Sequence, residues 1–188
     1  MTARKQPLVV VTVGGDHHPF DRLMDWVERW LLEEQPDVRC FVQYGPAWLP
    51  RGAEGSAYLD HPVLLDLIND ARAVVSSGGP ATLSEARLAG HRPLAVPRLA
   101  ALGEVVDDHQ RSFTQRLHER GAVVQVEDEH TFRAAITSAI DAPRLIPTAR
   151  TSPESVRLVG SLIDATAGWS DRSSEGKLVG ALLARVRL

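Results

Sequence analysis

One stretch, residues 74–85 (Val-Val-Ser-Ser-Gly-Gly-Pro-Ala-Thr-Leu-Ser-Glu), constrains the fold more than any other part of the sequence. A short β-branched run bounded by glycines is typical of a buried parallel strand. Pro80 is compatible with the first turn of a helix, and good helix formers follow it. The turn should therefore present free backbone N–H groups and a positive helix end above the strand. Glu85 would lie one turn inside the helix, placed for a ligand hydroxyl rather than a second anion. This combination suits a sugar nucleotide.

The 188 residues suit one full domain and are too few for two ordinary ones. The net charge of −3 and the sequence pI of about 6.2 argue against a general nucleic-acid binder. The single cysteine, Cys40, fits a reducing compartment and is expected to fill core space on a strand. No apolar run reaches the roughly 18 residues that span a bilayer, and the N-terminus does not resemble a signal peptide. We expect a cytoplasmic protein, either free or held at the cytoplasmic face of a membrane by a partner.

Strand-like and helix-like segments alternate along residues 8–140. Strands are expected at residues 8–13, 38–43, 57–59, 93–96 and 122–126 and around Val74. Helices are expected at about residues 21–33, 82–90, 105–119 and 131–140, with another that Pro62 opens. Such alternation predicts an α/β fold, a Rossmann-like parallel sheet with helices on both faces. In these folds ligands bind at the carboxyl ends of the strands, near the topological switch point.

The pattern changes after residue 142, so we expect two parts. Residues 1–142 would form the ligand-binding domain. Residues 143–188 would form a linker and C-terminal helices, at about 154–165 and 176–186. These helices could pack on the domain, lie on a membrane surface, or dock on a partner.

Gly14 and Gly15 end the first strand, where a phosphate-binding loop would lie. The dinucleotide fingerprint GxGxxG would need a third glycine where the chain has His18, and no Walker A Gly-Lys-Ser/Thr is present. The two glycines are equally consistent with a tight strand-to-helix turn that contacts no ligand.

Asp16, His17 and His18, together with Asp107, Asp108 and His109, are the candidates for a metal site. Adjacent side chains are expected to project in different directions, and no known ligand spacing is present. The sequence therefore predicts no metal site.

Residues 104–110 (Glu-Val-Val-Asp-Asp-His-Gln) enter the helix expected at 105–119. Asp107 or Asp108 would cap that helix. His109 shares a face with Phe113 and Leu117, which favours a buried core histidine unless it binds a ligand. Gln110 lies about 100° round the helix, where it could bond a ligand hydroxyl.

Five motifs occur in the order and spacing of the C-terminal domain of family 28 glycosyltransferases. They are Gly14-Gly15, Tyr58-Leu59-Asp60, residues 79–85, Pro97-Arg98 and residues 107–110. Residues 8–140 resemble this domain, which is the donor-binding half of the two-domain GT-B fold. The sequence is similar to the C-terminal half of the MurG-type peptidoglycan GlcNAc transferases. It is more similar to stand-alone versions, the PssE-like subunits and the catalytic subunits of dolichol-linked GlcNAc transferases.

The resemblance implies a role for each matching residue. Glu85 would hold the ribose hydroxyls, the main chain of Leu59 would contact the base, and His109 and Gln110 would reach the donor sugar. The diphosphate would be lined by Gly14, Gly15, Asp16, Gly79, Pro80, Ala81 and Thr82. Some residues depart from the family pattern: Ser77-Gly78 replaces the usual His-Ala, and Ala81 replaces a glycine. Asp16 would repel phosphate unless it points away.

The resemblance also implies a function, that of the donor-binding subunit of a two-component inverting hexosyltransferase. It would move a GlcNAc- or glucose-type group from a UDP-sugar to a lipid-linked acceptor in polysaccharide or glycolipid synthesis. A membrane-associated partner would supply the acceptor and the base, with His17 the candidate base in this chain. No cofactor or metal is implied, because Gly79, Thr82 and the helix dipole would stabilise the leaving diphosphate.

Two alternatives remain open. One is a non-catalytic nucleotide-sugar-binding or scaffold protein. The other, a sugar-nucleotide epimerase, would be expected to carry both GT-B domains in one chain.

Overall fold

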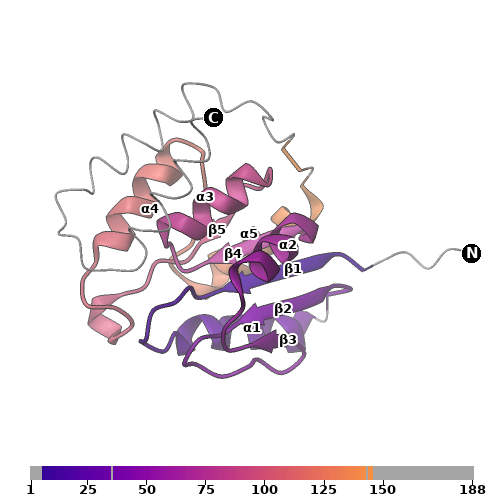
Figure 1. The fold of residues 1–188 in the computed structure, drawn as a ribbon, viewed down its shortest axis with the longest axis horizontal. Coiled ribbons are helices and arrows are strands. Elements are labelled where there is room, and N and C mark those ends of the chain that lie inside the picture. Colours follow the sequence, from indigo (N-terminus) through magenta and orange to yellow (C-terminus); the bar gives the residue numbers. More distant parts are fainter. Residues whose placement is uncertain (1–5, 35, 143, 146–188) are drawn as a thin grey trace, which may run out of the picture. The chain divides into compact units, whose positions relative to one another are not determined.

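The computed structural model describes residues 6–34, 36–142 and 144–145. These residues form a parallel six-stranded sheet with the order β3-β2-β1-β4-β5-β6 (Figure 1). The strands are β1 (Leu8–Thr12), β2 (Arg39–Gln43), β3 (Glu54–Ser56), β4 (Ala73–Ser76), β5 (Leu94–Ala95) and β6 (Val124–Gln125). The helices are α1 (Asp21–Glu34), α2 (His61–Asp70), α3 (Pro80–Leu88), α4 (His109–Glu119), α5 (Glu129–Asp141) and the short 3-10 helix η1 (Ala100–Leu102).

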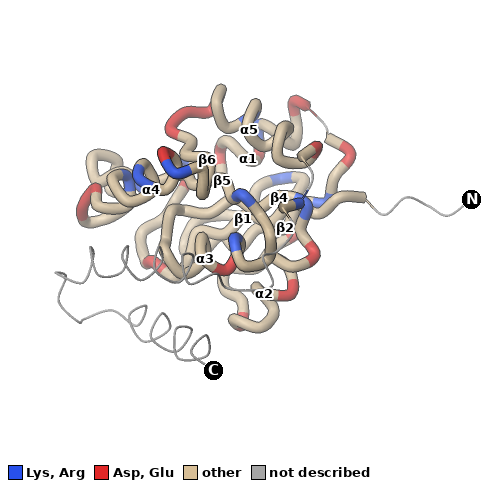
Figure 2. Tube along the Cα trace, turned by 90° about the horizontal axis from the view of Figure 1, so that it is seen from above, with Lys and Arg blue, Asp and Glu red and all other residues tan. Residues whose placement is uncertain are grey.

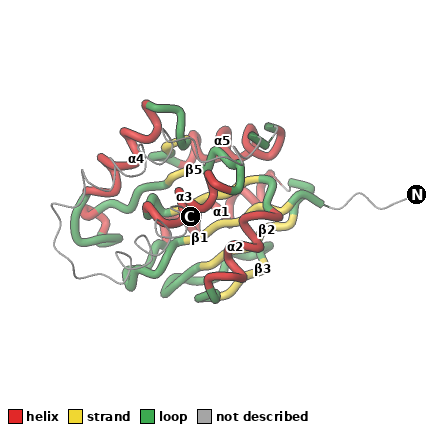
Figure 3. The backbone as a smooth tube through the Cα atoms, turned by 45° about the horizontal axis from the view of Figure 1, so that its top comes forward, coloured by secondary structure: helices red, strands yellow, loops and turns green. Residues whose placement is uncertain are grey.

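Helices cover both faces of the sheet (Figure 3). On one face, Val11 of β1 belongs to a core that includes Trp30 of α1 and Phe132 of α5. On the other face, Val10 and Val74 pack with α2 and α3. Because β1 and β4 are buried on both faces, their sequences are continuous apolar runs rather than alternating ones. The predicted α/β fold with helices on both faces is confirmed.

The topological switch point lies at the carboxyl ends of β1 and β4. β1 pairs with both β2 and β4. The chain runs outward from β1 through β2 to β3, then returns to β4 on the other side of β1. The loops that follow β1 and β4 therefore lead away in opposite directions, which is the arrangement that opens a ligand site in parallel sheets.

The third strand differs from its prediction. It forms at Glu54–Ser56, whereas residues 57–59 lie in a loop. The sequence Glu-Gly-Ser has little strand propensity, and pairing with β2 imposes the strand. The approach is close, since a Cβ on Gly55 would lie 2.2 Å from the carbonyl oxygen of Val42.

The helix predicted from residue 105 begins instead at His109. Glu104 is buried and bonded through its side chain to Arg22 and through its carbonyl to Arg98. Gly103 before it has a left-handed φ of 68°. These tertiary contacts hold residues 104–108 outside the helical conformation.

Residues of both charges are mixed along the chain. Figure 2 shows Lys and Arg interspersed with Asp and Glu along the described elements.

Cys40 is buried on β2, as expected, and burial raises the pKa of its thiol to about 12. Within the described residues, no helix combines the length and the apolar character that crossing a membrane requires. The predicted helices at 154–165 and 176–186 lie outside the described residues, and the division at 142/143 stays a prediction.

Arg98 is fully buried and bonds to two segments, the loop after β1 and the segment before α4. Its Nη1 donates to the carbonyls of His18 and Glu104, both at 2.9 Å, and its Nη2 donates to the carbonyl of Val13 at 3.1 Å. Its guanidinium carbon lies 4.6 Å from the ring centroid of Phe20. This side chain therefore fixes the loop after β1 to the segment after β5.

Replacing Arg98 with methionine would remove these donors and leave the Val13 carbonyl with only the hydroxyl of Ser77. We expect the free energy of unfolding to fall by about 3 kcal/mol or more, measured by urea denaturation. Arg116→Met, on the exposed side of α4, is the matched control and should change stability by less than about 0.5 kcal/mol. Equal losses in the two variants would contradict the structural role of Arg98.

Candidate functional site

The loop after β1 and the turn after β4 meet at the switch point. Ser77 Oγ donates to the carbonyl of Val13 at 3.0 Å, and a Cβ on Gly14 would lie 3.7 Å from that Oγ. Gly14 and Gly78 have φ values of 75° and 89°, in the left-handed region that favours glycine. A Cβ on Gly15 would meet no atom within 4 Å. The two segments are thus in contact, with open space beside Gly15.

The start of α3 offers unsatisfied backbone donors. Gly79 is the N-cap, and no side chain caps the helix. Pro80 has no N–H group, and the N–H of Leu83 bonds to the carbonyl of Gly79 at 3.2 Å. Within the described residues, the amides of Ala81 and Thr82 therefore have no partner. Amides at a helix start are suited to binding an anion.

Glu85 is a buried acid on α3, with only 8 % of the residue exposed. Its Oε1 lies 2.7 Å from Nε2 of His61, the first residue of α2. A buried carboxylate needs such a partner. The His61 side chain is 41 % exposed, so the pair reaches the surface through the imidazole. Leu59, half-buried just before α2, packs on the core beneath this helix.

His61 is not among the site residues that the sequence predicted. The available signal was its position directly after Tyr58-Leu59-Asp60 and before the helix-opening Pro62. Its pairing with Glu85, 24 residues away, requires α2 and α3 to pack side by side, which local sequence does not reveal.

α4 brings Gln110 to the β4–α3 turn. Its Oε1 is buried, has no hydrogen-bond partner within the described residues, and would lie 3.7 Å from a Cβ on Gly78. Buried acceptors without a partner are rare in proteins, so this oxygen is an unusual feature of the turn. His109 is half-exposed and bonded to Asp107. The alternative of a core histidine is therefore wrong, because the face that α4 buries contains Thr114 and Leu117.

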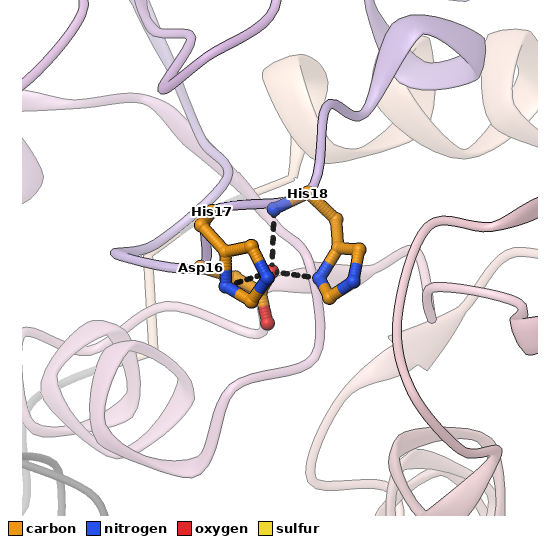
Figure 4. A group of neighbouring side chains, drawn as sticks. All are labelled: Asp16, His17 and His18. Atoms are coloured by element: carbon orange, nitrogen blue, oxygen red, sulfur yellow. Dashed lines mark hydrogen bonds and ion pairs between the residues drawn. The ribbon is translucent and has the colours of Figure 1, made fainter.

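Asp16, His17 and His18 point toward one another (Figure 4). Oδ1 of Asp16 accepts from the His18 amide at 2.8 Å and lies 2.7 Å from His18 Nδ1 and 4.0 Å from His17 Nδ1. The expectation that these side chains project in different directions is wrong, because the carboxylate folds the chain back in a local turn. Among the described residues, Asp107, Asp108 and His109 do not join this group.

The carboxyl of Asp16 is ionised at neutral pH. Partial burial works to raise its pKa. The hydrogen bonds from the amide and ring of His18, with the charge of Arg98 nearby, outweigh this effect and hold the pKa of Asp16 below its ordinary value.

A cavity of about 430 Å³ lies at the opposite end of the strands, near their amino ends. Its lining includes Glu34, Val38 and Asp141. It adjoins the carboxyl ends of α1 and α5, where helix dipoles disfavour anions. The carboxyl edge of the sheet, with its free amides, is therefore the better candidate site.

The predicted site residues lie around this edge. They belong to the β1–α1 loop, the segment before α2, the start and first two turns of α3, and the start of α4. In that order they are Gly14, Gly15, Asp16 and His17; Leu59; Gly79, Pro80, Ala81, Thr82 and Glu85; and His109 and Gln110. Their contacts with a ligand stay predictions.

No protein-family model and no curated protein matches this sequence. Solved structures do match, and one is titled as the glycotransferase of kitacinnamycin. It has a TM-score of 0.56 and 15 % identity, over 86 % of this chain and 39 % of its own. MurG of Acinetobacter baumannii matches with a TM-score of 0.52 and 18 % identity, over 86 % of this chain and 51 % of its own. ALG13 matches with a TM-score of 0.54 and 15 % identity, over 83 % of this chain and 96 % of its own.

The described fold is the Rossmann-like half of GT-B glycosyltransferases, which confirms the predicted fold class. This chain spans 39 % and 51 % of the kitacinnamycin and Acinetobacter baumannii proteins, respectively.

Gly78→Ala and Gly79→Ala form a matched pair for the turn after β4. The backbone φ of Gly78 is 89°, and a Cβ added there would lie 3.0 Å from Cγ2 of Thr114. A Cβ added at Gly79 would meet no atom within 4 Å. We expect Gly78→Ala to lower the free energy of unfolding by about 1–2 kcal/mol or more. Gly79→Ala should cost less, about 0.5 kcal/mol, because alanine is a weaker N-cap than glycine. Thermal and urea unfolding measure both. Similar losses at the two positions would show that the turn has another conformation.

Proposed function

We propose that this chain binds a UDP-sugar at the carboxyl edge of its sheet and supplies the donor-binding half of an inverting glycosyltransferase. The observation that supports this most directly is the uncapped start of α3, with the buried carboxylate of Glu85 on the same helix. A helix start with free amides suits a phosphate, and a carboxylate suits a sugar hydroxyl. The GT-B half fold supports the same function.

Each part of the donor would have its own contacts. The diphosphate accepts hydrogen bonds from the amides of Ala81 and Thr82, beside the open space at Gly15. The ribose hydroxyls bond to Glu85, whose position His61 fixes. The side-chain amide of Gln110, next to Gly78, bonds a hydroxyl of the donor sugar once the side chain turns toward it. The main chain of Leu59 contacts the base, and His109 lies beside the sugar.

In the proposed transfer, an acceptor hydroxyl attacks the anomeric carbon of the sugar, and the bond from that carbon to the diphosphate oxygen breaks. The free amides of α3 stabilise the negative charge that develops on the departing UDP. A general base accepts the proton of the hydroxyl. His17, which is exposed on the β1–α1 loop, is the candidate base in this chain; otherwise the base belongs to the acceptor side.

The acceptor side would come from a second component. The described residues contain one Rossmann-like sheet, and this chain spans about half or less of the matched glycosyltransferases other than ALG13. We propose a membrane-associated acceptor-binding subunit that presents a lipid-linked sugar for polysaccharide or glycolipid synthesis. The chain would then work at the cytoplasmic face of the membrane, moving a GlcNAc- or glucose-type group.

Glu85→Gln keeps the shape of the side chain but removes its charge. We expect it to weaken UDP-GlcNAc or UDP-glucose binding about 10- to 150-fold, because a hydrogen bond to a charged group contributes about 1.5–3 kcal/mol. Calorimetric titration measures the affinity, with GDP- and dTDP-sugars as specificity controls. Glu119→Gln, at the exposed end of α4, should bind like the unchanged protein.

His61 acts through Glu85, so its removal should not add to the loss at that position. We expect His61→Ala to weaken binding, and the double variant to bind about as weakly as Glu85→Gln alone. Additive losses would mean that His61 contacts the donor independently. Unchanged affinity in Glu85→Gln would remove Glu85 from the site.

The isolated chain should bind the donor yet transfer the sugar very slowly. The isolated chain lacks acceptor positioning in this proposal, which slows transfer even with His17 as the base. A base on the acceptor side would add a loss of about 10²- to 10⁴-fold in rate. The measurement is sugar transfer from a radiolabelled UDP-sugar to a polyprenyl-phosphate sugar in detergent, with and without membranes from cells that make the glycan. Rapid transfer without membranes would contradict the two-component proposal. Donor binding with no transfer even with membranes would favour the non-catalytic alternative.

A further inference from the structure

We propose that Asp16, His17 and His18 bind a divalent transition-metal ion such as Zn²⁺ or Co²⁺. One carboxylate and two imidazoles form a ligand set that these ions favour. Within the part of the chain that the structure describes, these three side chains form the one such group whose ligand atoms all lie within 4.8 Å of one another. Figure 4 shows both imidazoles turned toward the carboxylate.

The two distances that involve Asp16 are near those of a metal site. Two ligand atoms, each about 2.1 Å from a zinc ion, lie about 3.0–3.4 Å apart. The Asp16–His18 distance of 2.7 Å must open slightly, and the Asp16–His17 distance of 4.0 Å must close by less than an ångström. The side chains of His17 and His18 are 85 % and 24 % exposed, so solvent reaches the site and the His17 ring can turn.

The main chain around these side chains is already fixed. The buried Arg98 holds the carbonyls of Val13 and His18, which lie on either side of Asp16. The His18 amide bonds to Asp16 itself. A metal ion would therefore bind to a loop whose backbone is positioned by hydrogen bonds, which lowers the ordering cost of binding.

The position of Asp16 supplies a second argument, which rests on the proposed function. An ionised carboxylate in the β1–α1 loop would repel a diphosphate bound at the start of α3. A bound divalent cation reverses that interaction. Three protein ligands leave at least one coordination position open, and an oxygen of the diphosphate can occupy it.

The sequence predicted no metal site, in part because the three side chains were expected to diverge, and in the structure they converge. A metal at this site would also assign the general base. A His17 nitrogen that ligates a metal is not available as a base, so the base would then belong to the acceptor side.

The test uses the metal alone. Untagged protein, freed of metal with EDTA and dialysed, is titrated with Co²⁺ while its visible absorption is followed, and the bound Co²⁺ is then displaced with Zn²⁺. We expect one ion per chain and weakening by at least about 10-fold in His17→Ala and in Asp16→Asn, since even second-shell changes cost this much. His130→Ala, which removes an exposed histidine at the start of α5, should bind like the unchanged protein.

Because His17 is so exposed, His17→Ala should retain the unfolding midpoint and circular dichroism spectrum of the unchanged protein. Equal Co²⁺ binding by this variant and by the unchanged protein, or no binding by either, would overturn the proposal.

A parallel titration with UDP separates this proposal from the proposed function. If UDP binds in the presence of EDTA, and Co²⁺ does not bind when EDTA has been removed, the metal site is overturned and the proposed function stands. Co²⁺ binding that Asp16→Asn and His17→Ala weaken, with no UDP binding, would support the site and contradict the function. Co²⁺ that raises UDP affinity in the unchanged protein but not in Asp16→Asn would support both.

Discussion

The buried guanidinium of Arg98 is the interaction on which the candidate site depends. Burial lowers the pKa of Arg98, while the carboxylates of Asp16 and Glu104 work in the opposite direction. Because an arginine ordinarily titrates above pH 12, it stays charged. Its donors reach carbonyls of the β1–α1 loop and of the segment before α4. Arg22 pairs with Glu104 at 2.8 Å and bonds to the carbonyl of Pro97, which ties α1 to the same segment. The start of α4, and with it Gln110, takes its position from this network.

The second constraint is the order of the strands. β1 lies between β2 and β4, so the loops after β1 and β4 diverge at one edge. The start of α3 leaves its amides free there, while α2 and α3 bring His61 onto Glu85. Donors for an anion and a carboxylate for hydroxyls thus belong to one helix. The proposed binding of a nucleotide diphosphate sugar would use both groups.

The β1–α1 loop adds an electrostatic constraint to these two structural ones. Its glycines allow close approach to the β4–α3 turn, and Asp16 adds a negative charge to the same loop. Two imidazoles lie against that carboxylate. A cation bound by all three groups would give the loop a positive charge. The loop and the start of α3 would then both attract the same anionic ligand.

The sequence by itself determined the elements whose signals are local. β1 and β4 were predicted because strands buried on both faces are continuous apolar runs, and Gly78-Gly79-Pro80 specifies a strand-turn-helix within a few residues. The tertiary structure alone decided the features that join residues far apart in the chain. β3 forms at Glu54–Ser56 because β2 offers it a hydrogen-bonding edge, and α4 begins at His109 because Arg98 and Arg22 hold Glu104. The partner of Glu85 is 24 residues away in sequence, and the two donors to the Val13 carbonyl are 64 and 85 residues away. No local pattern contains such contacts, since they exist only after the sheet has brought its loops together.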